Sequence, residues 1–309
     1  MNKSLELSME VRKSGKKSIS YSQYNIYKSC PKRWKLTYID KHREFEPSIF
    51  LIFGTAIHEV IQEYLTKVYN ETAVEADKMD FRQLLKTKLQ KLYLETVKND
   101  NNGKHYSSPQ QLGEFYEDGI EILDYLRKKR NIYFSKKNCK LLGIEIPLSH
   151  VTPFNDKVVM IGFIDLVIQD GDELKIIDIK TSTMGWRKGQ KADNGDQLRI
   201  YKEYFSKQYG CEIDKIKIEY FIVKRKLYEN LDFPQRRIQI YEPPSGKPSM
   251  NKTNKILEDF VKNCFTEEGK YNKESPYPAI TGKNRKNCTY CEFSKKFDLC
   301  PKENRAIER

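Results

Sequence analysis

Two neighbouring apolar segments, each containing an aspartate, constrain the fold of this chain more than any other feature. Asp165 lies within the first segment, residues 162–168, and Asp178 lies within the second, residues 177–180. The sequence between them, residues 170–172, is Asp-Gly-Asp, which is typical of the turn of a β-hairpin. The pattern predicts two adjacent strands that each carry one carboxylate.

Alternation along the second strand places Ile177 and Ile179 on one face and Asp178 and Lys180 on the other. Two carboxylates beside an ammonium suit a site that holds a divalent metal. In such a site the metal polarises a phosphodiester, and the lysine orients or helps to deprotonate the attacking water. A single Asp-x-Lys in a strand is more often a surface ion pair, but the apolar neighbours of both acids favour the site.

Two upstream residues are further candidates for this site. His58 lies in the first turns of a helix predicted over residues 53–65, where apolar residues recur at helical spacing. A lone helical histidine is more often a solvated or core residue than a metal ligand. Glu145 lies in an apolar strand predicted over residues 141–148. Its simpler interpretation is a surface acid on an edge strand.

These residues, in this order, resemble the PD-(D/E)XK nuclease superfamily over nearly the whole chain. The resemblance is strongest to its RecB-type branch, which includes AddB-like proteins and CRISPR-associated nucleases with a cysteine-bound cluster. It implies an α/β core in which helices flank a mixed central sheet. Ile164 stands where the family name has proline, a position that fixes a turn and does no chemistry. The implied roles are metal ligation by His58, Asp165, Asp178 and the Ile179 carbonyl, catalysis by Lys180, and an auxiliary acid at Glu145.

Two helices strengthen the resemblance. Gln197 and Tyr201 lie one turn apart on one face of a helix predicted over residues 196–205 and resemble the Q-x-x-x-Y motif of the family, which borders the metal site and the nucleic-acid backbone. A tyrosine that only packs the helix on the sheet is an equally good interpretation of Tyr201. An aromatic helix over residues 20–34 reaches Cys30, as in family members with a cluster.

The cysteines indicate a metal rather than disulfides. The chain has 7 cysteines, and no sequence resembling a secretory leader precedes them, which disfavours a disulfide framework. Cys288, Cys291 and Cys300 are close in sequence, with Cys30 available from the other end. Four thiolates suit an iron–sulfur cluster or a structural zinc. The resemblance implies a [4Fe–4S] cluster, although the spacing between the last two cysteines is longer than in the family.

The charge suits a polyanionic partner. The chain has 56 Lys and Arg against 43 Asp and Glu, a formal net charge of +13. Trp186, Arg187 and Lys188 directly follow the strand with Asp178, and residues 224–228 repeat a mixture of basic and aromatic residues. Contacts to a nucleic-acid backbone combined with base stacking are the expected use of such runs. Solvated loops are the alternative for both.

The predicted organisation is a single nuclease domain over residues 18–309, preceded by a flexible tail over 1–17. Amphipathic helices over 79–98 and 109–131, separated by a disordered-looking stretch at 99–103, form a helical insert at about 66–135. Strands follow over 140–180, 216–223 and 237–241, then a helix over 253–265. The cysteine-rich segment, residues 281–303, is expected to join the two chain ends. No apolar stretch is long enough for a membrane span.

The sequence therefore predicts a metal-dependent phosphodiesterase that uses Mn²⁺ or Mg²⁺. By resemblance, we expect an exonuclease acting on DNA with single-stranded ends in recombination, repair or phage-type replication. A helicase or recombinase partner and a cytoplasmic location in a bacterial or phage-infected cell fit that expectation. The main alternative is a non-catalytic DNA-binding or scaffolding protein with the same fold, and a redox sensor built on the cysteines is a third. Intact His58, Asp165, Asp178 and Lys180 argue against both.

Overall fold

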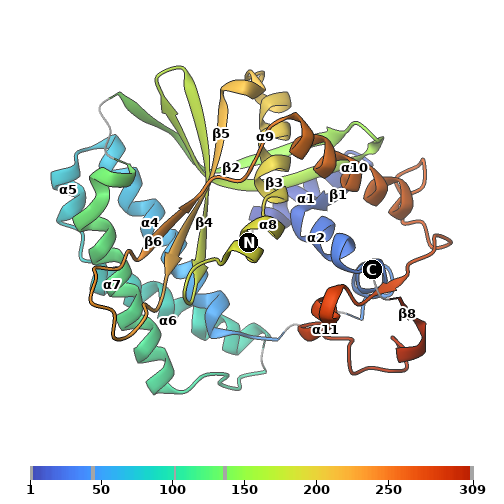
Figure 1. Ribbon diagram of the computed structural model, residues 1–309, viewed down its shortest axis with the longest axis horizontal. Helices are drawn as coiled ribbons and strands as arrows, with labels where there is room; N and C mark the ends of the chain where they lie inside the picture. Colours follow the sequence, from blue (N-terminus) through green and yellow to red (C-terminus); the bar gives the residue numbers. More distant parts are fainter. Residues whose placement is uncertain (1–2, 43–45, 101, 135–137, 307–309) are drawn as a thin grey trace.

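A mixed β-sheet forms the centre of the protein (Figure 1). The computed structural model describes residues 3–42, 46–100, 102–134 and 138–306. Within these residues the sheet has six strands in the order β1-β3-β4-β5-β6, and β2 pairs with β3 off this path. The pairs β1·β3 and β4·β5 are parallel, and β2·β3, β3·β4 and β5·β6 are antiparallel. The strands are β1 (Lys17–Ser20), β2 (Cys139–Thr152), β3 (Asn155–Asp170), β4 (Glu173–Ser182), β5 (Ile216–Lys224) and β6 (Ile238–Tyr241).

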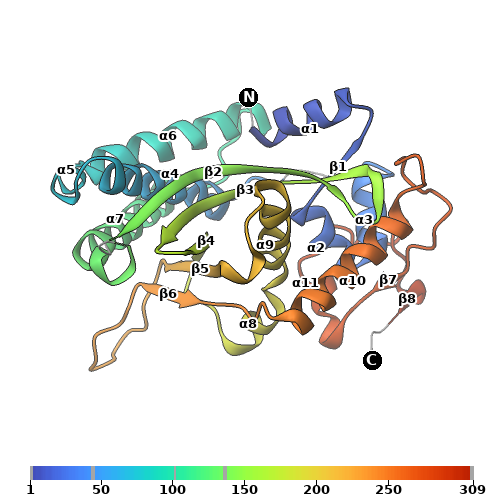
Figure 2. The same cartoon turned by 90° about the horizontal axis from the view of Figure 1, so that it is seen from above.

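Helices cover both faces of this sheet (Figures 1 and 2). One buried cluster joins α4, α6 and α7 to Leu166, Ile177 and Phe221 of the sheet, and a second joins α2, α9 and α10 to Ile176 and Ile222. The α-helices are α1 (Lys3–Lys13), α2 (Tyr21–Ser29), α3 (Pro31–Tyr38), α4 (Ile49–Asn70), α5 (Ala73–Asp77), α6 (Phe81–Asp100), α7 (Pro109–Tyr133), α8 (Lys188–Asp193), α9 (Asp196–Tyr209), α10 (Lys247–Cys264) and α11 (Lys286–Thr289). The shorter elements are the 3-10 helices Ile213–Lys215, Lys283–Arg285 and Lys302–Asn304 and the strands β7 (Ala279–Ile280) and β8 (Arg305–Ala306). The predicted α/β fold with a mixed sheet flanked by helices is confirmed.

The hairpin with the two aspartates forms as predicted. β3 ends at Asp170 and β4 begins at Glu173, so a two-residue turn connects them, with Gly171 at φ +62°. Ile177 and Ile179 of β4 are buried in the cluster with α4, α6 and α7. Asp178 points to the opposite face, which places it beside α9.

The helices predicted over 79–98 and 109–131 are α6, which begins and ends two residues later than predicted, and α7, which ends two residues later. Their apolar sides pack with α4 on one face of the sheet. The stretch at 99–103 that was predicted to be disordered is partly ordered, because α6 continues through Asp100 and a turn follows at Asn102 and Gly103. Residue 101 lies outside the described residues. The division of the chain into a domain and an insert stays a prediction.

The N-terminal segment differs from the predicted flexible tail. Residues 3–13 form α1, and Val11 is buried against Val159 and Ile161 of β3, with Leu7 beside it. Leu7 and Val11 are one turn apart, so they lie on one side of the helix, whereas Leu5 and Met9 are exposed. These four apolar residues alternate with polar ones in the sequence, so the pattern did not have helical periodicity and did not reveal this helix. Lys17 then begins β1, which is paired with β3.

The aromatic helix predicted over residues 20–34 is interrupted at Cys30. This residue is extended, at φ −161° and ψ 105°, and separates α2 from α3. Pro31 explains the break, because a residue before proline is disfavoured in the helical conformation. The C-terminal segment packs beside α3, where the Lys32 amide donates to the Pro278 carbonyl. The segment around Cys30 and the C-terminal segment therefore lie side by side.

A buried carboxylate ties α9 to both neighbouring helices. The Asp196 side chain accepts hydrogen bonds from Tyr24 and Lys28 of α2, at 2.8 Å and 2.6 Å. It also accepts from Thr253 of α10 at 2.7 Å and from Arg199 at 3.0 Å. Burial alone would raise the Asp196 pKa, but the Lys28 and Thr253 hydrogen bonds, the Lys28 charge and the Tyr24 hydrogen bond outweigh it and lower the pKa.

We expect Asp196→Ala to lower the free energy of unfolding by about 3 kcal/mol at pH 7, because it leaves two cations without their buried partner. Glu258→Ala, which breaks the exposed pair with Lys262, should cost less than about 0.5 kcal/mol. The Asp196 pKa is lower in the folded protein than the unfolded-state pKa of about 3.9, so the ionised carboxylate stabilises the fold above that pH. This stabilisation is lost as the pH falls through the folded-state pKa. Urea unfolding should therefore show the effect of Asp196→Ala shrinking below about pH 4. A pH-independent difference would contradict this role.

No helix in the described ranges combines the length and the apolar character needed to cross a membrane.

Candidate active site

The site lies where β3 and β4 separate. Their pairing runs only from Leu166 with Ile177 to Asp170 with Glu173. Before Leu166, β3 pairs with β2 and β1 instead, and after Ile177 β4 pairs with β5. Asp165 and Asp178 are the first residues beyond the pairing on each strand. Both carboxylates therefore lie in the opening of a fork in the sheet, which side chains can enter from both faces.

Asp178 is the most buried group of the site. Its side chain is 3% exposed, Oδ1 accepts a hydrogen bond from Gln197 Nε2 at 2.8 Å, and Oδ2 lies 2.7 Å from Lys180 Nζ. The contact with Lys180 is an ion pair without hydrogen-bond geometry, so among the described residues Oδ2 has no hydrogen-bond partner. Burial raises the Asp178 pKa to about 6 against the opposing charge of Lys180. A buried, incompletely satisfied carboxylate of this kind fits a cation.

Asp165 and Lys180 complete the charged centre. Asp165 Oδ2 accepts a hydrogen bond from the Ile179 amide at 2.7 Å, which bridges the fork. Burial raises the Asp165 pKa to about 6 as well, opposed by the Lys180 charge. Burial alone would lower the Lys180 pKa, but the charges of Asp178 and Asp165 outweigh it and raise the pKa. The sequence prediction that two carboxylates and one ammonium converge is confirmed.

His58 enters the fork from the α4 side. Its Nδ1 lies 3.6 Å from Asp165 Oδ2, and burial lowers its pKa to about 4, so the imidazole is neutral near pH 7. Neutral imidazole is the form that binds metals. The helix begins at Ile49, so His58 lies in its third turn and not in the first turns as predicted. Ile49, Ile52 and Phe53 extend the helix because they continue its buried face, whereas Phe50 and Leu51 are exposed.

Glu145 lies opposite Asp165 on β2, since its neighbours Ile144 and Ile146 pair with Leu166 and Ile164. Its φ of +52° is in the left-handed region, which is strained for a glutamate and is a feature that clusters at functional sites. Gln62 Nε2 donates to Glu145 Oε1 at 2.9 Å and is 3.4 Å from the Asp165 carbonyl. Glu145 is thus half-buried and held at the fork, although β2, which pairs with β3 alone among the described strands, is an edge strand.

Gln62 is a site residue that the sequence reading missed. It is 7% exposed and lies one helical turn after His58, on the same side of α4. The signal available in the sequence was the position of this glutamine, four residues after the candidate ligand His58.

Gln197 and Tyr201 reach the site from α9. Gln197 Nε2 holds Asp178 and also lies 3.2 Å from the Tyr201 hydroxyl. Tyr201 is 6% exposed, and its ring lies over Gly162 of β3, where a Cβ would come within 3.0 Å of the ring. Packing of α9 on the sheet therefore accounts for Tyr201, and a contact of either residue with nucleic acid stays a prediction.

Trp186, Arg187 and Lys188 follow β4 beyond the fork. The Trp186 ring packs on Tyr220 at 4.8 Å, and its amide donates to Gln239 Oε1 at 2.7 Å. Arg187 and Lys188 are exposed. Their role in binding nucleic acid stays a prediction.

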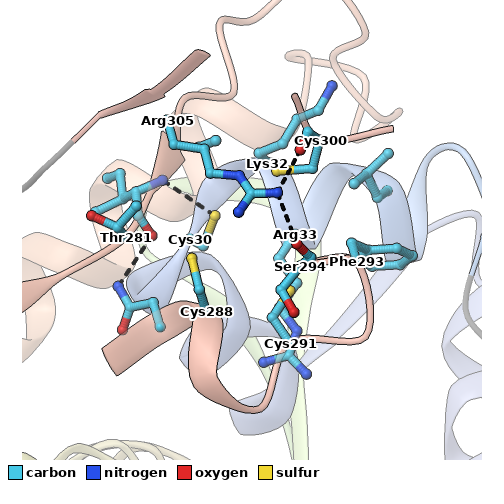
Figure 3. A pocket seen from close by; sticks show the side chains of 14 residues that line it. Cys30, Lys32, Arg33, Thr281, Cys288, Cys291, Phe293, Ser294, Cys300 and Arg305 are labelled. Atoms are coloured by element: carbon cyan, nitrogen blue, oxygen red, sulfur yellow. Dashed lines mark hydrogen bonds between the residues drawn. The ribbon is translucent and has the colours of Figure 1, made fainter. Parts of the chain in front are cut away.

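The four candidate cysteines line one small pocket between the two chain ends (Figure 3). All four are free thiols, and the pocket volume is about 20 Å³. The Ile280 amide donates to Cys30 Sγ at 3.4 Å, and burial raises the Cys291 pKa. Amide donors to sulfur are a feature of metal-bound thiolates. The predicted meeting of Cys30 with Cys288, Cys291 and Cys300 is thus present, and the metal that would join them is not shown.

Neither these thiols nor the acids with His58 form a group of three or more side chains already placed to hold a metal ion, within the part of the chain that the structure describes. The donor types nevertheless fit: carboxylate oxygens and one imidazole at the fork, and thiols at the chain ends.

Two solved structures are similar to parts of this chain. The crystal structure of SSO0001 has a TM-score of 0.31 and 21% identity, and the match covers 62% of this chain and 74% of that chain. The crystal structure of a candidate exonuclease from Eubacterium rectale has a TM-score of 0.44 and 11% identity, with 81% of this chain and 80% of that chain covered. Neither similarity is close enough to support a conclusion about this chain. No protein with a curated description matches the sequence.

The sequence model that describes the PD-(D/E)XK nuclease superfamily matches residues 18–296, which include the fork and its acids. The chain belongs to the PD-(D/E)XK nuclease superfamily.

Proposed function

We propose that this protein is a metal-dependent nuclease that hydrolyses phosphodiester bonds of DNA. The observation that carries the proposal is the buried Asp178 carboxylate, 2.7 Å from the Lys180 ammonium and facing Asp165 across the fork. A structural ion pair would not require a second buried carboxylate, a histidine and a strained glutamate at the same position.

The residues that would hold the divalent ion are Asp165, Asp178, His58 and the Ile179 carbonyl. When bound, Mg²⁺ or Mn²⁺ supplies Lewis-acid polarisation of the scissile phosphodiester. Lys180 is one-third exposed, so its ammonium is accessible to a water or a phosphate oxygen while Asp178 fixes its position. Gln197 holds Asp178 on the α9 side.

Glu145 acts as the auxiliary acid of the site, positioned by Gln62. A cleft of about 1250 Å³ opens beside His58 and Glu145 between α4, α6 and the β2–β3 pair. This cleft gives solvent access to the fork from the Glu145 side.

For the substrate, we propose DNA with a single-stranded end, cut as an exonuclease in recombination, repair or phage-type replication. Support comes from the net charge of +13 and from the basic and aromatic residues that follow β4. The Gln197–Tyr201 pair and the four cysteines support the RecB-type branch. A helicase or recombinase partner is part of the same proposal, and the free thiols are consistent with a reducing cytoplasm.

For the cysteines, we propose a [4Fe–4S] cluster bound by Cys30, Cys288, Cys291 and Cys300. A structural zinc bound by the same thiols is the alternative, because the donor set suits both. Either group would join the two ends of the chain.

A cleavage assay tests the proposed function. Purified protein is incubated with 5′- or 3′-labelled single-stranded and double-stranded DNA, with Mg²⁺, Mn²⁺ or EDTA. We expect metal-dependent cleavage and a product ladder that shortens from one end. Binding without cleavage under every metal condition would instead support the non-catalytic DNA-binding alternative. A fixed set of internal fragments would contradict the exonuclease assignment.

We expect Mn²⁺ to support cleavage at least as well as Mg²⁺. His58 adds a nitrogen donor to a site of oxygen ligands, and nitrogen ligation favours softer ions than Mg²⁺. Initial rates at matched, saturating concentrations of each metal measure this preference. The variant His58→Asp, which restores an all-oxygen site, should shift the preference towards Mg²⁺. A wild-type rate in Mg²⁺ far above that in Mn²⁺ would argue against His58 as a ligand.

A further inference from the structure

A pocket of about 490 Å³ lies at the carboxyl ends of β4 and β5, where both strands leave the sheet. This volume is within the roughly 300–1,000 Å³ of small-ligand sites. The pocket is lined by Tyr133 of α7, by Met184, Gly185, Trp186 and Arg187 after β4, by Lys224 and Tyr228 at and after the end of β5, and by Arg236, Ile238, Gln239 and Ile240 at β6. The site residues at the fork are absent from this lining, so the pocket is a separate hollow.

The strand register places two residues of this pocket, Lys224 and Gln239, on the face of the sheet that carries Lys180, whereas Tyr133, Ile238 and Ile240 belong to the cluster on the opposite face. Lys180 pairs with Ile222 and Ser182 pairs with Lys224, while Ile222 also pairs with Gln239. Paired residues share a face and alternate residues return to it, so Lys224 and Gln239 are on the face of Lys180. Two residues along a strand span about 7 Å, so the pocket lies within reach of the nucleotides next to Lys180.

The charges of the pocket are unbalanced. Three of its lining residues, Arg187, Lys224 and Arg236, are cationic, and none is acidic. In the described part of the chain, none of the three has a carboxylate within ion-pair distance. Burial lowers the pKa of Lys224, as expected for a cation without a counter-ion. An anion in the pocket would provide that missing charge.

The neighbouring cations of the same loop are neutralised. Arg225 and Lys226 both form ion pairs with Asp118 of α7, at 2.6 Å and 3.0 Å, and Arg237 pairs with Glu121. These pairs fix the base of the loop over residues 225–237, which projects from the body beyond β6 (Figure 2). The ion-paired cations Arg225, Lys226 and Arg237 therefore anchor the loop, while the unpaired cations line the pocket.

Aromatic side chains occur among the unpaired cations. Trp186 lines the pocket, and its loop is held by a double contact in which its amide donates to Gln239 Oε1 and its carbonyl accepts from Gln239 Nε2, at 2.7 Å and 3.0 Å. Tyr228 is 55% exposed at the pocket, and Tyr133 reaches it from α7. Aromatic faces beside unpaired cations match a nucleotide, whose base stacks and whose phosphate is anionic.

The cleft on the other side of the fork has a different character. Its lining has four carboxylates, Glu59, Glu63, Glu95 and Glu145, against three lysines, Lys3, Lys88 and Lys91, and Lys88 is already paired with Glu59 and Glu63. This mixed lining is less favourable to a polyanion than a pocket whose charged residues are all cationic. Of the two hollows beside the fork, the pocket at Trp186 is the one that suits a nucleic-acid strand.

We propose that this pocket is a subsite for one unpaired nucleotide of a single-stranded segment of the substrate, close to the scissile phosphate. Trp186, Tyr228 and Tyr133 contact the base, and Arg187, Lys224 and Arg236 contact the flanking phosphates. A base held there cannot pair with a second strand, so the subsite selects single-stranded over double-stranded DNA. The inference rests on the proposed nuclease function and adds the location at which the protein distinguishes single-stranded from double-stranded DNA.

Binding of the full-length protein to a fluorescent dT₁₂ oligonucleotide in EDTA tests the subsite without cleavage. The chain has 2 tryptophans, and Trp34 is 0% exposed, so it contributes a constant background to the fluorescence. We expect dT₁₂ to quench the Trp186 emission, and inorganic polyphosphate, which has no bases, to leave it unchanged. A duplex of the same length should bind at least tenfold more weakly. Binding of dT₁₂ without quenching would overturn the base contact.

Matched variants test the charges. Lys224→Ala combined with Arg236→Ala should weaken dT₁₂ binding at least tenfold and reduce the slope of log K against log salt by about 1.4, since each lost phosphate contact removes about 0.7 on a single strand. The control Lys252→Ala combined with Lys255→Ala removes two exposed charges from α10 and should bind as the wild type does. Tyr228→Ala, at an exposed position, should weaken binding about tenfold.

Two results separate the subsite from the nuclease function. Equal binding by the Lys224/Arg236 variant and its control, together with an unchanged Tyr228→Ala, would overturn the subsite even if the wild type cleaves DNA. Absence of metal-dependent cleavage by the wild type would overturn the proposed function, while the loss of dT₁₂ binding in the pocket variants would still establish a nucleotide site.

Discussion

Asp178→Asn and Lys180→Ala should each reduce DNA cleavage by about 10³-fold or to below detection. Asp178 loses an anionic ligand without losing volume, and Lys180 loses the charge that positions the attacking water. Cleavage is measured with end-labelled single-stranded DNA in saturating Mn²⁺. DNA binding without divalent metal should persist, because neither side chain lines the pocket at Trp186. Retained binding would show that the substitutions impair the cleavage step and not the binding of DNA.

The chain offers matched controls for both variants on the same pair of strands. Glu173 of β4 and Lys217 of β5 form an exposed ion pair, each 55% exposed. Glu173→Gln and Lys217→Ala remove the same charges as Asp178→Asn and Lys180→Ala, and both should cleave DNA at the wild-type rate. If Asp178→Asn also cleaves at that rate, the fork between β3 and β4 is not the catalytic site.

The hairpin and its acids could be predicted because their pattern is local. Asp165, Asp178 and Lys180 lie within sixteen residues, and a period of two determines which side chains share a face. The same information cannot show that β3 and β4 separate at the acids, because separation depends on β3 pairing with β1 and β2 instead. The sequence therefore predicted the charged groups, and the fork that makes room for a substrate came only from the sheet.

Contacts between distant segments were harder to predict. Gln62 is 83 residues from Glu145, to which it donates, and the left-handed φ of Glu145 has no local signal such as a glycine. The α1 helix was missed for the same reason, since Leu7 and Val11 become a hydrophobic side only where β3 presents Val159 and Ile161. In each case the stabilising partner is elsewhere in the chain, so propensity and periodicity in the segment itself were insufficient.

The nucleotide pocket shows how the two kinds of information combine. Trp186, Arg187 and the run from Lys224 to Tyr228 are visible in the sequence as basic and aromatic residues. Only the structure separates the cations that anchor the loop on α7 from those without a carboxylate. The composition indicates only a tendency to bind nucleic acid, whereas the structure identifies which cations should be substituted to test it.

The second large effect concerns the joining of the chain ends by the cysteines. Protein purified without oxygen should be brown and contain iron and sulfide at the level of one [4Fe–4S] cluster per chain. Cys30→Ser should abolish cluster binding, because Cys30 is the ligand supplied by the N-terminal half. The free thiol Cys211, which lies outside the pocket, provides the control, and Cys211→Ser should retain full metal content.

Loss of the cluster should also destabilise the fold. A link from Cys30 to Cys288 closes more than two hundred residues of chain, and loop-closure entropy for such a length is on the order of 5 kcal/mol. The thermal midpoint of Cys30→Ser should therefore fall by about 10 °C relative to Cys211→Ser. Cleavage should decline only in proportion to unfolding, because Cys30 is outside the fork. A colourless protein with one zinc per chain would retain the link and contradict the cluster. An unchanged midpoint and metal content in Cys30→Ser would show that no metal joins the two ends.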